Sequence, residues 1–241
     1  SPAILPAIAI LFTGYLIGRE SMTALALTVL DGGAALGVLL SAALAGGWLV
    51  RLLGLGDNPL RDRLIVGAGL GVGLLSSIVL CLGMAGVLTR SAMLVLVGTL
   101  AISGILSVLA DLWPLLRRTP RSSDVSGVDP IALRRQVLAI NGLHYLWLLA
   151  CPFLALAAMA AANPPGVLWV EEAGGYDVLE YHLAVPREFL EAGHIFFMPY
   201  NVYSNFPLNG EMISLLMMAL RGNAIEASFM AQMANVALGL L

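Results

Sequence analysis

The chain has 241 residues, of which 59% are hydrophobic and only 11% are charged, and its formal net charge is -3. Because a soluble domain carries about 25% charged residues, this composition excludes an ordinary water-soluble globular protein. The small negative charge gives no reason to expect a nucleic-acid partner. We therefore predict an all-α, polytopic helical membrane protein whose partners include membrane lipids.

Apolar runs long enough to cross a bilayer recur along the chain. A helix needs about 20 apolar residues to span the hydrocarbon core, because every backbone polar group must be satisfied within it. The clearest runs occupy residues 34–50, 64–88, 92–112 and 137–161. Weaker candidates occupy residues 3–17, 23–30, 212–220 and 227–241. We predict about six or seven membrane helices.

Asp31 interrupts the N-terminal apolar runs, next to Gly32 and Gly33. An ionisable residue inside a membrane helix often marks an ion path, and a transporter is the weaker interpretation of this position. The adjacent glycines favour a break in the helix. We expect Asp31 to lie at such a break, at the membrane interface.

The placement of arginines predicts the orientation of the chain. One loop precedes the helix at 64–88, and another follows the helix at 92–112. Together these loops hold eight of the twelve arginines, namely Arg51, Arg61, Arg63, Arg117, Arg118, Arg121, Arg134 and Arg135. Two crossings separate these loops, so both lie on one side, which the positive-inside rule makes cytoplasmic. The loop at 162–208 is then exoplasmic, and we expect a bacterial inner-membrane location.

A linker-like segment, PRSSDVSGVDP at 120–130, divides the chain. Its serines, prolines and charges are typical of a connection rather than of a membrane helix. We predict an N-terminal transmembrane helical module at 1–119 and a cytoplasmic arginine-rich linker at 120–135. A second unit at 136–241 contains a membrane helix, the exoplasmic loop 162–208 and the membrane helices that follow.

One polar segment, Tyr176–Met212, stands between apolar runs, and we call it the polar island. It contains two histidines, four tyrosines, three asparagines and three prolines together with several carboxylates. A membrane protein that gathers so many hydrogen-bonding groups at one interface is expected to use them. The polar island is therefore the candidate functional region.

Asp177 and Glu180 are three residues apart and would share one face of a helix. One interpretation is a catalytic pair in which one carboxylate acts as a base toward a hydroxyl. The other is a capping box, with Asp177 at the helix N-cap and Glu180 at the third helical position. Both interpretations stay open, since a capping carboxylate can also take part in catalysis.

The residues that follow predict an amphipathic helix that ends at Gly193. Its apolar stripe consists of Leu179, Leu183, Pro186 and Leu190. A helix of this kind can lie in the plane of the membrane interface, and a glycine is a common C-terminal stop.

A second group of polar residues surrounds Pro207. The group consists of Asn201, Tyr203, Ser204, Asn205 and Asn209. These residues are suited to binding the hydroxyls of a sugar or a phosphate, and they are also suited to forming a turn. The two island histidines, His182 and His194, are twelve residues apart, a spacing that does not predict a metal site.

The order of these features resembles the first exoplasmic loop of GT-C class membrane glycosyltransferases, the group that contains protein O-mannosyltransferases and aminoarabinose transferases. In that family an acidic motif follows a membrane helix. An interfacial helix ending in glycine comes next, and a proline-containing turn leads into the following membrane helix. YDVLEYH, VPREFLEAGHIFF and YSNFPLNGEM occupy those places here, and the resemblance covers residues 137–241.

The resemblance implies an enzyme that transfers a sugar from a polyprenyl-phosphate donor to an exoplasmic acceptor hydroxyl, with inversion at the anomeric carbon. Asp177 would be the catalytic carboxylate, with Glu180 as the second acid. The residues implied to contact the substrate are His182, Tyr181, Tyr203, Asn205 and Asn209. Some members of the family use a divalent cation, so that cofactor stays open.

The alternative is a non-catalytic transmembrane subunit of a larger respiratory or photosynthetic complex, descended from a transferase. Glycine-rich helices and sparse charge favour it, because small residues let membrane helices approach closely. It would require partner subunits, and only then would a haem or pigment be expected, with His144 as a candidate ligand. We also expect the natural chain to continue beyond Leu241, where further membrane helices would favour the enzyme.

Overall fold

The structure is a computed structural model that describes residues 19–117, 146–165 and 176–239. Within these ranges every regular element is helical. The long helices are α2 (Arg19–Leu52), α3 (Leu60–Met84) and α4 (Arg90–Arg117), followed by α6 (Leu146–Ala161). The polar island and the residues that follow it form a π-helical turn η3 (Val178–His182), α7 (Ala184–Ala192), a 3-10 turn η4 (Val202–Asn205), α8 (Asn209–Arg221) and α9 (Ser228–Leu238).

Three of the helices are long and apolar enough to cross a membrane, over Thr28–Leu52, Leu60–Met84 and Arg90–Trp113. This confirms the all-helical class and the membrane character of the N-terminal half. The described part of α6 is shorter, at 16 residues. The predicted helix at 3–17, the start of the helix at 137–161 and His144 lie outside the described residues, so the larger number of spans stays a prediction.

The predicted break at Asp31 is wrong, because α2 runs without interruption through Gly32 and Gly33. Asp31 is 2% exposed, and its Oδ1 atom lies 2.7 Å from Nη2 of Arg221 at the end of α8. Its Oδ2 atom is buried with no partner among the described residues. A tertiary ion pair thus holds the carboxylate inside a continuous helix.

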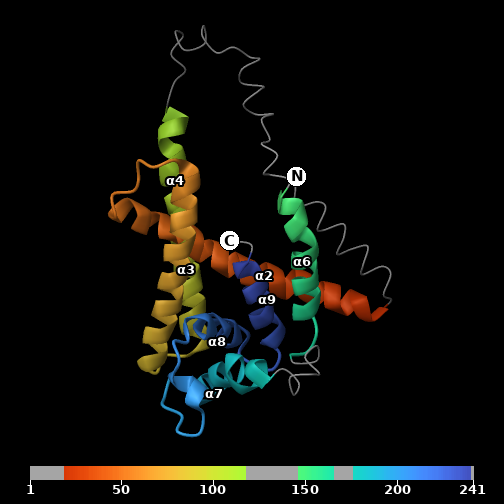
Figure 1. The fold of residues 1–241 in the computed structure, drawn as a ribbon. Helices are drawn as coiled ribbons and strands as arrows, with labels where there is room; N and C mark the ends of the chain where they lie inside the picture. Colours follow the sequence, from red (N-terminus) through yellow and green to blue (C-terminus); the bar gives the residue numbers. More distant parts are fainter. Residues whose placement is uncertain (1–18, 118–145, 166–175, 240–241) are drawn as a thin grey trace, which may run out of the picture.

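Small residues bring α2 and α3 into backbone contact. A Cβ built at Gly71 would overlap the carbonyl oxygen of Ala42, and one at Gly46 would overlap the carbonyl oxygen of Gly67. Close approach of this kind is how membrane helices gain dispersion contacts without a hydrophobic driving force. In Figure 1, α2 lies obliquely across the nearly parallel α3 and α4.

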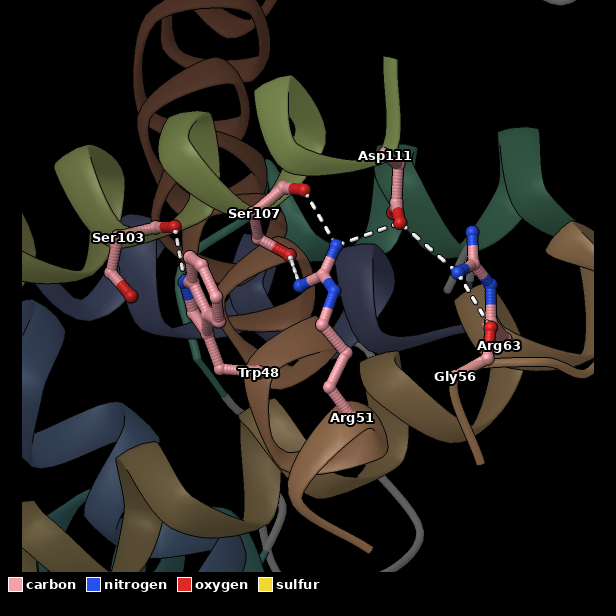
Figure 2. A network of polar contacts seen from close by, with 7 residues as sticks. All are labelled: Trp48, Arg51, Gly56, Arg63, Ser103, Ser107 and Asp111. Carbon is pink, nitrogen blue, oxygen red and sulfur yellow. Dashed lines mark hydrogen bonds and ion pairs between the residues drawn. The ribbon is translucent and has the colours of Figure 1, made fainter. Parts of the chain in front are cut away.

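A polar cluster fastens α2, α3 and α4 at one end of the bundle (Figure 2). Asp111 of α4 accepts from Arg51 of α2 at 2.7 Å and from Arg63 of α3 at 3.0 Å. Arg51 also donates to the Ser107 hydroxyl and carbonyl at 3.0 and 2.8 Å. Trp48 donates to the Ser103 carbonyl at 3.0 Å, and its ring lies under the Arg51 guanidinium. We call this end of the bundle the arginine end.

The polar island lies at the other end of the bundle; in Figure 1, α8 lies beside the lower parts of α3 and α4, and α7 lies below α8. The backbone N–H of Ile195 donates to the Gly83 carbonyl near the end of α3 at 2.9 Å. Because α3 begins beside the arginine cluster and ends at this contact, the arginine end and the polar island occupy opposite ends of the same helix.

Helix α8 is the centre of the core. Nine consecutive residues, Glu211 to Ala219, are buried, and α8 contacts α3, α4, α7 and α9. The hydrophobic core combines these residues with side chains of α2 such as Leu39 and of α3 such as Leu75. The core therefore joins residues from both sides of the predicted 120–135 linker, while the domain boundary itself stays a prediction.

We expect Gly71→Ala to destabilise the fold and Gly69→Ala to stabilise it slightly. The added methyl of the first variant overlaps backbone, whereas Gly69 has open space around it. Overpacking costs about 1–3 kcal/mol, and alanine is about 1 kcal/mol better than glycine in a helix. Thermal unfolding of the detergent-solubilised protein measures both, and equal midpoints for the two variants would contradict the α2–α3 contact.

We expect Arg221→Leu to destabilise the protein by about 2–4 kcal/mol, because it leaves the Asp31 carboxylate buried without its partner. The figure is set below that of a fully buried pair because the Arg221 side chain is 43% exposed. The double variant Asp31→Leu/Arg221→Leu should recover most of the loss. SDS-induced unfolding gives the comparison; a double variant less stable than Arg221→Leu would show that the pair is not the source of the effect.

Candidate functional site

The first part of the polar island folds as a π-helical turn rather than as the start of a regular amphipathic helix. The N–H of Leu183 donates to the Val178 carbonyl at 3.1 Å, a spacing of five residues. This extra residue places Val178, His182 and Leu183 together on one cavity wall. π-helical turns are rare and occur frequently at functional sites.

Asp177 and Glu180 are both exposed at this turn. The capping-box interpretation is wrong for this structure, because the Asp177 side chain makes no capping hydrogen bond. The structure gives neither carboxylate a hydrogen-bond or ion-pair partner among the residues that it describes. Both acids are therefore available to a ligand, as the catalytic interpretation requires.

Aromatic rings cover the turn beside these acids. The Tyr181 and Tyr203 rings stack with centroids 4.8 Å apart, and the Tyr181 ring lies 4.0 Å from the His182 imidazole. Burial raises the pKa of Tyr181, and the charges of Asp177 and Glu211 raise it further. At neutral pH the Tyr181 phenol therefore keeps its proton and can donate a hydrogen bond.

Asn201, predicted either to bind a ligand or to form a turn, serves the turn in the structure. Its amide donates to the Glu180 carbonyl at 3.0 Å and its carbonyl accepts from the Tyr203 N–H at 3.0 Å. Asn201 is buried, so these bonds fix the η3 turn against η4. The available signal was an asparagine two residues before Tyr203, the spacing of an Asx turn.

The other two predicted asparagines, Asn205 and Asn209, make contacts that stabilise the local backbone. Asn205 donates to the Val202 carbonyl at 3.2 Å within η4. Asn209 begins α8, and its carbonyl accepts from the Ser76 hydroxyl at 2.6 Å. These contacts agree with the turn interpretation, and the structure does not bring either side chain to Asp177.

A short polar contact in the site joins His182 to Glu211. The imidazole Nδ1 lies 2.6 Å from the Glu211 carboxylate, whose side chain is 11% exposed, against 45% for His182. Sequence reasoning identified His182 but missed Glu211. A lone carboxylate at the start of an otherwise apolar helical run was the signal, since burying a charge is costly unless it is paired.

A cavity of about 550 Å³ opens beside this pair, bounded by α6, η3, α8 and α9. Its walls combine apolar residues of α6, such as Ala157 and Ala160, with the polar side chains of Ser214, Gln232 and Asn235. The volume falls within the range of small-molecule sites. The cavity connects the polar island to the apolar helices.

Helix α7 frames the site and ends as predicted. Gly193 adopts φ 75°, and its N–H donates to the Leu190 carbonyl, closing the helix. The predicted apolar stripe is confirmed in part: Pro186 is buried, as are Val185 and Phe189 beside the stripe, whereas Leu183 and Leu190 are half-buried. Tyr200 donates to the Glu188 carboxylate, which raises the Tyr200 pKa and holds the loop after α7.

The histidines His182 and His194 do not meet. His194 contacts the Ala192 carbonyl at 3.0 Å and the Phe196 ring. Among the described residues no group of three or more histidine, cysteine, aspartate or glutamate side chains could hold a metal ion. The candidate site thus consists of carboxylates, one imidazole and aromatic rings beside a cavity.

Comparison of the chain with family models, with curated proteins and with solved structures gives no match.

Proposed function

We propose that the chain is a membrane glycosyltransferase of the GT-C type, which moves a sugar from a polyprenyl-phosphate donor to an acceptor hydroxyl. One observation carries the proposal: Asp177 and Glu180, whose side chains have no ion-pair or hydrogen-bond partner among the described residues, lie on the same short turn as His182, which contacts Glu211 of α8 beside the cavity. The cavity wall reaches the apolar helix α6. A lipid-linked donor and a polar acceptor need such a boundary in order to meet.

In the proposed reaction Asp177 acts as the general base. Its carboxylate takes the proton of the acceptor hydroxyl while the hydroxyl oxygen attacks the anomeric carbon of the sugar. The bond from that carbon to the phosphate oxygen breaks, and polyprenyl phosphate leaves with the electron pair. Attack on the side opposite the leaving group inverts the configuration at the anomeric carbon. Glu180 is the neighbouring carboxylate and provides a second proton acceptor close to Asp177.

The distribution of charge supports an exoplasmic site in a bacterial inner membrane. Arg51 and Arg63 lie at the arginine end, and the carboxylates of the polar island lie at the opposite end of α3. Under the positive-inside rule the arginine end is cytoplasmic. The proposal therefore places sugar transfer on the far side of the membrane, where a lipid-linked donor is the usual way to supply an activated sugar.

We expect Asp177→Asn to lower sugar transfer by about 10²–10⁴-fold, the usual contribution of a general base. The substitution keeps the size of the side chain and removes no hydrogen bond that the structure shows. Transfer is measured with the full-length protein in membrane vesicles, using a panel of polyprenyl-phosphate hexoses and pentoses. Thermal unfolding of the same preparation checks that the variant remains folded.

Glu191→Gln is the matched control, because Glu191 is an exposed carboxylate of α7 whose only ion pair among the described residues is with Arg187. It should transfer sugar at the unaltered rate. Normal turnover in Asp177→Asn would remove Asp177 from the mechanism. Equal losses in Asp177→Asn and Glu191→Gln would point to a general effect of negative charge rather than to base catalysis.

A second candidate, a structural subunit of a larger membrane complex, is favoured by the outer surface of the helices. Only 22% of the most apolar part of α4 is buried within the chain, and side chains such as Val95 and Ile102 are exposed. Lipid or partner helices would cover this surface. Stable co-purification with other membrane chains, without sugar transfer by the intact complex, would favour the subunit.

A further inference from the structure

The charge of the cavity wall limits what the cavity can bind. Among the described residues that line it there is one carboxylate, Glu211, one histidine, His182, and no arginine. Phosphate sites in proteins use arginine, lysine or exposed backbone N–H groups. The first turn of α8 brings backbone at Gly210 and Glu211 to this wall. An ionised phosphate there would lie beside the Glu211 carboxylate with no side-chain cation among the described lining residues, so the wall favours an uncharged ligand.

The His182–Glu211 contact fixes which group the cavity offers. An ionised carboxylate can only accept hydrogen bonds, so the Nδ1 atom of His182 carries the proton in their 2.6 Å contact. In a neutral imidazole the other nitrogen, Nε2, is then an acceptor. The structure gives Nε2 no partner among the described residues, and His182 lines the cavity.

The remaining walls divide into an apolar side and a polar side. Helix α6 contributes methyl groups, including those of Ala157 and Ala160. Helices α8 and α9 contribute Ser214, Gln232 and Asn235. Gln232 donates to the Asn163 carbonyl at 3.3 Å, so this side chain is held in place. An apolar side next to ordered polar groups matches an amphiphile with a hydroxylated head.

We propose that this cavity is the acceptor site, and that its ligand is an uncharged amphiphile with at least two head-group hydroxyls: one donates to Nε2 of His182, and another is the hydroxyl that reacts at Asp177. Glu211 is the positioning residue that holds the imidazole in the accepting tautomer. The apolar chain of the ligand lies along α6, and Ser214, Gln232 and Asn235 receive the rest of the head. This assignment rests on the proposed function for the reaction and adds the chemical class of the acceptor.

Photo-crosslinking tests the assignment without requiring sugar transfer. The full-length protein in mild detergent is labelled with a monoacylglycerol that carries a diazirine in its acyl chain. The matched probe is a lysophosphatidic acid with the same diazirine chain. Mass spectrometry of peptides then locates the adducts. We expect the neutral probe to label residues 146–161 and 228–239, and the phosphate-headed probe to label them about tenfold less.

Two variants and one control complete the experiment. His182→Phe removes the acceptor nitrogen and keeps a ring of similar size, so labelling at fixed probe concentration should fall about tenfold, the effect of one lost hydrogen bond. Ala157→Phe, at an exposed position of α6, fills the cavity and should abolish labelling there. Ala155→Phe adds the same ring to a residue of α6 that does not line the cavity, and should label normally.

The outcomes separate this inference from the proposed function. Equal labelling by both probes, preference for the phosphate-headed probe, or normal labelling of His182→Phe would overturn the neutral-acceptor assignment. If the neutral probe labels the cavity and the variants behave as expected while no sugar is transferred, the binding site stands and the reaction fails. If sugar is transferred but the adducts lie elsewhere, the reaction stands and the cavity is not the acceptor site.

Discussion

Burial of α8 is the constraint on which the rest of the structure depends. Nine consecutive residues of α8 are buried, and the helix packs against α3, α4, α7 and α9. Three polar groups of the helix have partners from other elements. Ser76 of α3 donates to the first residue of the helix, and Asp31 of α2 pairs with Arg221 in its last turn. Glu211 in its first turn pairs with His182.

These three contacts connect α8 to α2, to α3 and to the π-helical turn. An unsatisfied buried group costs more than a made hydrogen bond returns, so each contact fixes the position of α8 as well as the element that it meets. The Glu211–His182 contact fixes the position of the π-helical turn relative to α8, and Asp177 and Glu180 lie on the same turn. The geometry of the candidate site is thus set by the core of the protein rather than by a free loop.

The amino-acid sequence predicts those parts of the fold that depend on local pattern. Helical class, the long apolar helices and the stop at Gly193 follow from hydropathy and from the left-handed conformation that glycine allows. The sequence did not predict the continuity of α2 through Gly32, because the ion pair that supports it joins residues 190 apart. Glu211 was missed for the same reason, since its partner lies 29 residues away, and the contact of Asn201 with Glu180, 21 residues away, was not predicted either.

Two groups of acidic residues in the described chain differ in a way that bears on function. Asp31, Asp111 and Glu211 are each paired with a basic group and hold elements together. Asp177 and Glu180 are exposed and have no such partner within the described ranges. A structural carboxylate is recognisable by the two elements that its ion pair joins. Asp177 and Glu180 form no ion pair within the described ranges, and they lie on a turn whose position the core fixes. They therefore have the properties of groups placed to meet a substrate.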